Sequence, residues 1–278
     1  MSVVELSKPL GDYVEVFLGR SSSEEIRRGR LGSGGAVTSL LIYLLEEGVV
    51  DSVVVARRVK GLVGELVVAR TREEVLKAAG SKWNVLPFTS KLKETIEDVG
   101  VRSVAIVGLP CQSQFLQQMR SFPLLETDFV SKIRLIISLF CIGTFATEAF
   151  ISILEKHYGL RPESISQVGV ERSFIRVVYD GEEKLIPINE VLPYLQLGCL
   201  VCPDYTGVFS DISAGVSESH LGYTVLIVRN DNALSTLHDA VSKGYLEVVK
   251  APPDVIEELE VKARGKIVRA AKYMGLIL

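Results

Sequence analysis

The chain has 278 residues, of which 47% are hydrophobic and 23% are charged, and its formal net charge at pH 7 is -3. A chain of this length buries about 75% of the surface that it exposes when unfolded, so it can form a full hydrophobic core without metals or disulfides. The slightly acidic charge gives no electrostatic support for nucleic-acid binding. We therefore expect a globular protein whose four cysteines are not needed for stability.

The N-terminal residues lack the basic start, the apolar block and the cleavage site of a signal peptide. The longest uncharged segment, residues 135–147, is well short of the ~20 apolar residues that span a bilayer. We expect a cytoplasmic protein without a membrane span. In that compartment thiols bind metals or act in catalysis more often than they form disulfides.

Short Val- and Ile-rich runs alternate with amphipathic segments over the first 160 residues, which is typical of an α/β protein. The apolar runs at 102–110 and 133–141, with a helical segment at 111–120 after the first, predict a βαβ unit with parallel strands. The other strands expected here are residues 12–19, 51–58 and 65–71, and the other helices are 36–47, 72–80, 91–100 and 144–159.

From residue 161 onward the expected strands are shorter and more polar. The predicted fold class is α/β, with a mixed sheet flanked by helices and a second, smaller α/β portion. We place an N-terminal α/β region at residues 1–160 and a C-terminal α/β region at 161–278. The strands expected in the second region are 164–171, 173–181, 183–188 and 223–230, and its helices are 232–244 and a charged one from about Pro253.

The four cysteines are the residues with the clearest chemical potential. Cys111 follows one apolar strand at the first turn of a helix, where free amides favour a thiolate, and Cys141 ends the next strand. If these strands are parallel, both sulfur atoms emerge at the carboxyl edge, where open α/β sheets bind ligands. Cys199 and Cys202 share a loop, and their spacing lets two thiolates bind one centre.

Four interpretations of these cysteines remain open on the residues alone. Cys111 and Cys141 are compatible with small buried core residues, and the Cys-x-x-Cys pair with a redox couple that lacks the usual flanking strand and helix. Structural zinc is a third interpretation, although such sites usually carry two Cys-x-x-Cys pairs. The fourth is an iron-sulfur cluster, for which Pro203 after Cys202 is typical. On the residues alone, the zinc and the iron-sulfur interpretations are about equally well supported.

A glycine-rich turn opens the first long helix, with Ser33, Gly34 and Gly35 before it and Thr38 in its first turn. Free amides at such a start suit a phosphate, although an ordinary capped turn explains the pattern equally well. Lys82 follows a glycine that ends a helix, and a plain surface lysine is at least as good an explanation. Residues 209–224 are expected to form a polar loop.

Several motifs together resemble the beta subunits of coenzyme F420 hydrogenase and dehydrogenase, an iron-sulfur flavoprotein family that works on the deazaflavin coenzyme of methanogens and other archaea. The motifs are GSGGAVTSLLIYLLEEGVVDSVVV, GSKW, VAIVGLPCQSQFL, LFC, CLVCPD, SDISAG and YTVLIVR, in this order over residues 12–250.

The resemblance implies a flavin-dependent oxidoreductase that transfers hydride between coenzyme F420 and FAD, with electrons passing through one 4Fe-4S cluster to a partner. Its site residues would divide into three groups. Ser33, Gly34, Gly35 and Thr38 would hold flavin phosphate, Ser81 and the catalytic Lys82 would lie near the flavin or substrate, and Cys111, Cys141, Cys199 and Cys202 would ligate the cluster.

Two departures from the family pattern affect these expectations. The chain has no further cysteine run, so the electrons need an outside carrier, and we expect a partner subunit or a ferredoxin docking around Pro203–Gly207. The loop after DIS is less glycine-rich than the loop of the family. The resemblance therefore does not identify the exact hydride acceptor. The family also acts on several substrates, and a homo-oligomer is compatible with it.

The alternative is a non-enzymatic scaffold or interaction protein in which the four cysteines hold a stabilising zinc ion.

Overall fold

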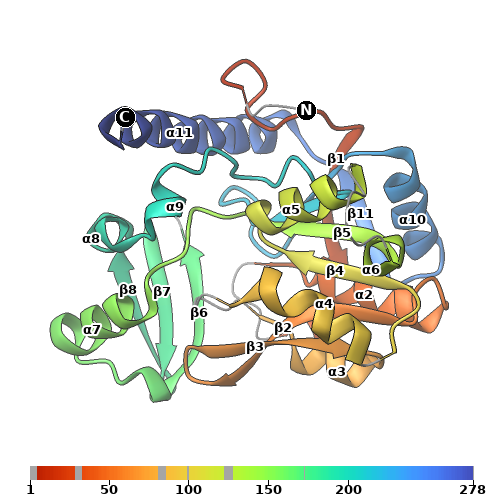
Figure 1. Ribbon diagram of the computed structural model, residues 1–278, viewed down its shortest axis with the longest axis horizontal. Helices are drawn as coiled ribbons and strands as arrows, with labels where there is room; N and C mark the ends of the chain where they lie inside the picture. Colours follow the sequence, from red (N-terminus) through yellow and green to blue (C-terminus); the bar gives the residue numbers. More distant parts are fainter. Residues whose placement is uncertain are drawn as a thin grey trace.

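The chain is described by a computed structural model over residues 5–28, 33–80, 86–98, 100–121, 128–171 and 173–277. Figure 1 shows a large sheet with helices on both faces, and a small sheet with its own helices at the left. The long C-terminal helix runs across the top of both. No helix in these ranges is long and apolar enough to cross a membrane.

The elements follow one another along the chain as labelled in Figure 1. The strands are β1 (Glu15–Ser21), β2 (Ser52–Lys60), β3 (Val63–Ala69), β4 (Val104–Gly108), β5 (Ile133–Leu139), β6 (Ile165–Glu171), β7 (Phe174–Tyr179), β8 (Glu182–Pro187), β9 (Ile212–Gly215), β10 (Thr224–Val228) and β11 (Leu246–Lys250). The α-helices are α1 (Glu24–Arg27), α2 (Ala36–Glu46), α3 (Arg72–Lys77), α4 (Phe88–Asp98), α5 (Pro110–Ser121), α6 (Asp128–Ser131), α7 (Thr147–Tyr158), α8 (Ile188–Val191), α9 (Leu197–Leu200), α10 (Asp231–Ser242) and α11 (Pro253–Ile277). Two short 3-10 helices are η1 (Pro162–Ser164) and η2 (Leu192–Tyr194).

The large sheet has eight strands in the order β11-β1-β10-β9-β5-β4-β2-β3. Its centre is parallel, because β2, β4, β5 and β9 all run in one direction. The strands towards both edges pair antiparallel. The predicted mixed sheet is therefore confirmed, and so is the predicted parallel βαβ unit formed by β4, α5 and β5.

Alternating side chains of the strands give the large sheet a separate core on each face. Val53 and Val55 of β2 pack with α2, α3 and α10, whereas Val54 between them packs with α4, α5 and α6. On this second face α11 covers the half of the sheet formed by β1 and β10. Successive residues of a strand point to opposite faces, so the apolar runs bury both sides of the sheet.

The small sheet, with strand order β6-β7-β8, is the second and smaller α/β portion that the sequence predicts. It forms its own core with α7 and the segment that contains α8, η2 and α9. Beyond it the chain returns to the large sheet as β9, β10 and β11. Strands from both sides of residue 160 thus share one sheet, and the division into domains at that position stays a prediction.

Candidate functional site

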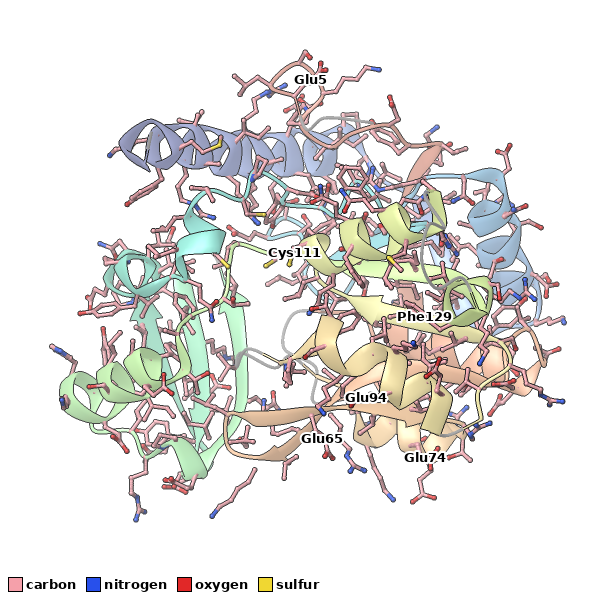
Figure 2. All side chains as sticks on the ribbon, viewed as in Figure 1. Glu5, Glu65, Glu74, Glu94, Cys111 and Phe129 are labelled. Carbon is pink, nitrogen blue, oxygen red and sulfur yellow. The ribbon has the colours of Figure 1, made fainter. Side chains whose placement is uncertain are left out.

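Cys111 and Cys141 lie at the same edge of the large sheet. Cys111 is the second residue of α5, directly after β4, and Cys141 stands two residues beyond the end of β5. Because β4 and β5 run parallel, both cysteines follow the carboxyl ends of their strands, as the sequence predicts. Figure 2 shows Cys111 on the side of α5 that faces α9.

The Cys-x-x-Cys pair is attached to the chain segment that leaves β5. Cys199 lies in α9, and its Sγ accepts a hydrogen bond from the backbone N–H of Thr144 at 3.3 Å. Beyond Cys202, the carbonyl of Tyr205 accepts a hydrogen bond from the backbone N–H of Cys141 at 2.9 Å. Contacts on both sides of the pair thus hold it beside Cys141.

The four thiols are close enough to affect one another electrostatically. Burial raises the pKa of Cys141 to about 11, with smaller contributions from the charges of Cys199 and Cys111. The pKa of Cys111 is also raised, first by burial and then by the charges of Cys202 and Cys199, although its side chain reaches the surface. Burial and these charges outweigh the effect of the free amides at the start of α5, which we expected to lower the pKa of Cys111.

The cysteines share one region without forming a site for a single ion. In the ranges that the structure describes, no three Cys, His, Asp or Glu side chains are grouped so that they could hold one metal ion. A structural zinc ion needs its four ligands within about 2.3 Å of one point. The arrangement of these thiols therefore does not match a preformed zinc site.

Two cations of α11, which the sequence analysis did not single out, border the cysteines. Lys266 is only 5% exposed, and its ammonium donates to the carbonyls of Cys141 at 2.7 Å and Asp204 at 2.6 Å. The Arg269 guanidinium donates to the carbonyl of Cys199 at 3.2 Å. Their spacing of three residues places them on one helix face, a signal that the sequence carries but that does not reveal what they contact.

The loop predicted to dock a partner, Pro203–Gly207, is largely buried. Asp204, Tyr205 and Thr206 are only 6%, 7% and 0% exposed. The Asp204 carboxylate accepts two backbone N–H groups of the chain just after it, at 2.7 and 3.0 Å, so it folds the loop inward. The predicted docking position is therefore wrong, because these side chains do not face solvent.

The glycine-rich turn is packed against the C-terminal part of the chain. A Cβ added at Gly34 would lie 2.8 Å from the backbone oxygen of Gly222. Gly35 has a φ of +74° and immediately precedes α2, whose start is not capped by any described side chain. Ser33 and Thr38 are partly buried beside it. Ser81 and Lys82 lie outside the described residues.

The loop after β9 is held by α11. The Glu258 carboxylate accepts the hydroxyl of Ser217 at 2.6 Å and the backbone N–H of Glu218 at 2.9 Å, and it pairs with Lys262 at 2.7 Å. Burial of Glu258 opposes its ionisation, but these hydrogen bonds outweigh burial and lower its pKa to about 2. One helix thus contacts both the cysteine region and the loop whose sequence departs from the family pattern.

Comparison with known proteins relates this chain to one family. The C-terminal part of the coenzyme F420 hydrogenase/dehydrogenase beta subunit matches residues 101–254, and the N-terminal part matches residues 16–93. The chain is 30% identical over 276 residues to the coenzyme F420 hydrogenase subunit beta of Methanothermobacter thermautotrophicus, covering 96% of this chain and 98% of that protein. The corresponding subunit of Methanococcus voltae is 30% identical over 268 residues, covering 93% and 94%.

A solved structure supports the same relationship. A chain in the F420-reducing [NiFe] hydrogenase complex from Methanosarcina barkeri superimposes with a TM-score of 0.88 at 30% identity, covering 95% of this chain and 92% of that one. The two family matches together extend over nearly all of the large sheet, and the C-terminal match includes the positions of all four cysteines. The chain belongs to the coenzyme F420 hydrogenase/dehydrogenase beta subunit family.

Proposed function

We propose that the chain is the subunit of an oxidoreductase that transfers hydride between coenzyme F420 and FAD, and that passes the electrons through one 4Fe-4S cluster to a partner. The observation that carries this proposal is the convergence of Cys111, Cys141, Cys199 and Cys202 at the carboxyl edge of the sheet. The full-length relatives, which are named for coenzyme F420, support the substrate.

The cysteines fit a cluster better than a single ion. Each iron of a four-iron cluster binds its own cysteine, so the sulfur atoms stand further apart than around one zinc ion. Other cysteines contribute to the raised pKa of Cys111 and of Cys141, so the four thiols lie near one another, yet the described residues include no group suited to one ion. The N–H group of Thr144 already donates to the sulfur of Cys199, a contact that would stabilise a thiolate ligand.

The flavin is proposed to bind with its phosphates at the start of α2. Uncapped amides at a helix start bind phosphate well, and the hydroxyls of Ser33 and Thr38 would add donors. Gly34 and Gly35 would contribute the close packing and the left-handed backbone that shape this turn. Ser81 would lie close to the flavin or substrate.

Binding and orientation are the tasks of the protein's own residues. A bound flavin would exchange hydride with the deazaflavin and single electrons with the cluster. Lys82 is the proposed catalytic residue, whose cation would sit beside the reacting rings. If this role is correct, Lys82→Ala lowers turnover and flavin or substrate binding more than it lowers stability.

A partner must complete the electron path, because the four cysteines are all used by one cluster. The similar chain from Methanosarcina barkeri is part of a multi-subunit hydrogenase complex, which supports a partner subunit for this chain as well. A ferredoxin would serve the same purpose. Cys111 reaches the surface and is the proposed ligand nearest to such a carrier.

The first test is the cofactor content of protein purified under anaerobic conditions. We expect about four iron and four sulfide per chain, absorbance in the range of about 400–450 nm, and flavin reduction by reduced coenzyme F420. Colourless protein with stoichiometric zinc and no reaction with the deazaflavin would instead support the zinc-stabilised scaffold.

The second test assigns the ligands. Cys199→Ser and Cys202→Ser should each lose most of the iron and sulfide while the far-UV circular dichroism stays unchanged, because the core does not depend on these thiols. Val49→Ser is a control that should retain the cluster, because Val49 is exposed and lies just before β2, at the opposite end of the parallel strands from the cysteines. Full iron content in either cysteine variant contradicts the assignment.

A further inference from the structure

The C-terminal helix α11 carries a row of charged residues that the family matches do not include. Those matches end at residue 254, whereas α11 continues to Ile277. Glu258, Lys262, Lys266 and Arg269 follow one another at intervals of three or four residues, so they lie along one face of the helix. This face meets the loop after β9 at one end and the cysteine region at the other.

Lys266 is a buried cation that makes no salt bridge among the described residues, and the Asp204 carboxylate, which acts on it electrostatically, is shared with Arg229. Its ammonium lies between two chain segments and donates to the carbonyls of Cys141 at 2.7 Å and Asp204 at 2.6 Å. A buried charge is costly unless an opposite charge compensates it. By contrast, Lys262, one turn earlier, pairs with both Glu218 and Glu258.

Arg269, like Lys266, donates its hydrogen bonds to backbone carbonyls. Its Nη2 donates to the carbonyls of Ile142 at 2.7 Å and Cys199 at 3.2 Å, while its buried Nε has no partner in the part of the chain that is described. The guanidinium therefore lies against the two chain segments that carry Cys141 and Cys199. A donor thus remains free on a cation that borders the cysteine region.

We infer that Lys266 and Arg269 are positioning residues that compensate the negative charge of a cysteine-bound cluster and raise its reduction potential, an inference that rests on the proposed function. Four thiolates carry more negative charge than the core of the cluster neutralises, and reduction adds one further electron. Nearby fixed cations in a poorly hydrated site favour the more negative state, and charge and hydrogen bonding near the sulfurs are known determinants of cluster potential. Both cations also fix the carbonyls of the chain segments that present Cys141 and Cys199.

The experiment compares neutral and charge-conserving variants of the anaerobically purified protein. Lys266→Met and Arg269→Gln remove a charge at similar length, whereas Lys266→Arg and Arg269→Lys retain it. Arg264→Gln is the matched control, because Arg264 lies on the exposed side of α11 and pairs with Glu260. The readouts are the midpoint potential of the cluster by EPR-monitored titration, the iron content, and the circular dichroism of each variant.

We expect the potential to become more negative in each neutral variant and to stay near that of the wild type in the charge-conserving variants and in Arg264→Gln. A folded neutral variant that loses iron while its charge-conserving counterpart retains it also supports the inference. Unchanged potentials and iron contents in both neutral variants would overturn it, and so would failure of Lys266→Met to fold if Arg269→Gln keeps the wild-type potential. Wild-type protein that binds no cluster would overturn the proposed function itself, which is a separate result.

Discussion

At Gly34 the backbone of the glycine-rich turn passes between two other segments of the protein. A Cβ at this position would lie 2.8 Å from the side chain of Arg20, from the carbonyl of Gly19 and from the carbonyl of Gly222. Backbone carbonyls of a sheet strand and a turn cannot move aside as easily as the end of a flexible side chain. Gly34 therefore has a packing role whether or not the turn binds a flavin.

This packing predicts that Gly34→Ala destabilises the protein by about 1–3 kcal/mol, as overpacking of a tight site usually does. Urea unfolding of the two proteins measures the difference. Gly265→Ala is the control, because Gly265 lies inside α11 with no atom within 4 Å of an added Cβ. That change should stabilise the protein by about 0.5–1 kcal/mol through helix propensity. Equal stability of Gly34→Ala and the wild type would contradict the packing role.

The sequence predicts the positions of some site residues but not the contacts of others. The positions of Cys111 and Cys141 follow from two apolar runs with a helix between them, because parallel strands present their carboxyl ends at one edge. Lys266 lies 125 residues from Cys141, and its contact depends on how α11 crosses the sheet. Helix periodicity shows which residues share a face, but it does not show what that face covers.

Among the elements, β9 is the clearest difference from the sequence prediction. The sequence predicts a polar loop for its residues Ile212–Gly215, yet they form a buried strand between β5 and β10. The hydroxyl of Ser213 is satisfied by the guanidinium of Arg229 at 2.9 Å. A four-residue strand with a serine and a glycine lacks a local signal, and its pairing on both sides comes entirely from tertiary structure.

For α11 the sequence predicts only a charged C-terminal helix, and the structure shows why its charges are specific. Glu258 binds the segment from Ser217 to Ser219 through side-chain and backbone donors. These hydrogen bonds favour the ionised carboxylate, so its pKa in the folded protein is lowered to about 2. The unfolded chain has the ordinary value of about 4.3.

Because the folded-state pKa is depressed, this carboxylate contributes stability above pH ~4.3, and the contribution is lost as the pH falls towards ~2. At neutral pH the shift corresponds to at most about 3 kcal/mol. In Glu258→Gln we expect a lower free energy of unfolding at pH 7 and a smaller loss between pH ~4.3 and ~2 than in the wild type. Urea unfolding at a series of pH values measures both.

A suitable control for this titration is Glu260→Gln, since Glu260 lies on the exposed side of α11 and pairs only with Arg264 among the residues described. Exposed pairs of this kind contribute about 0–1 kcal/mol. The free energy of unfolding of Glu260→Gln should therefore depend on pH almost as it does in the wild type. If the free energy of unfolding of Glu258→Gln changes with pH as it does in the wild type, the network at Glu258 does not link α11 to the loop as described.

At the scale of the whole molecule, the large sheet combines strands from both ends of the chain around the parallel centre. This arrangement brings α2, which follows β1, and α11, which ends the chain, to opposite faces of one sheet. The sequence could predict the parallel centre, because its runs are apolar on both faces. It could not predict that β1 pairs with β10 and β11, since antiparallel pairing across more than 200 residues has no local signature.

At this scale we can also predict where the proposed redox partner would approach the cysteines. Tyr205 is buried, whereas Leu197 and Tyr194, just before Cys199, are 76% and 41% exposed. An exposed leucine and tyrosine beside the proposed cluster ligands are the kind of anchors that the core of an interface buries. We therefore expect the partner to contact Leu197 and Tyr194.

The corresponding prediction is that Leu197→Asp raises the half-saturating concentration of ferredoxin, in reoxidation of the reduced protein, by about tenfold or more, which equals about 1.4 kcal/mol. A carboxylate placed in the interface loses the apolar contact and is desolvated without a partner. Stopped-flow measurement of reoxidation against ferredoxin concentration gives this value, and reduction of the flavin by reduced coenzyme F420 should stay unchanged. Val49→Asp is the matched control, because Val49 is an exposed apolar residue just before β2, at the opposite end of the parallel strands from the cysteines. An unchanged ferredoxin dependence in Leu197→Asp, or an equal effect in Val49→Asp, would place the docking surface elsewhere.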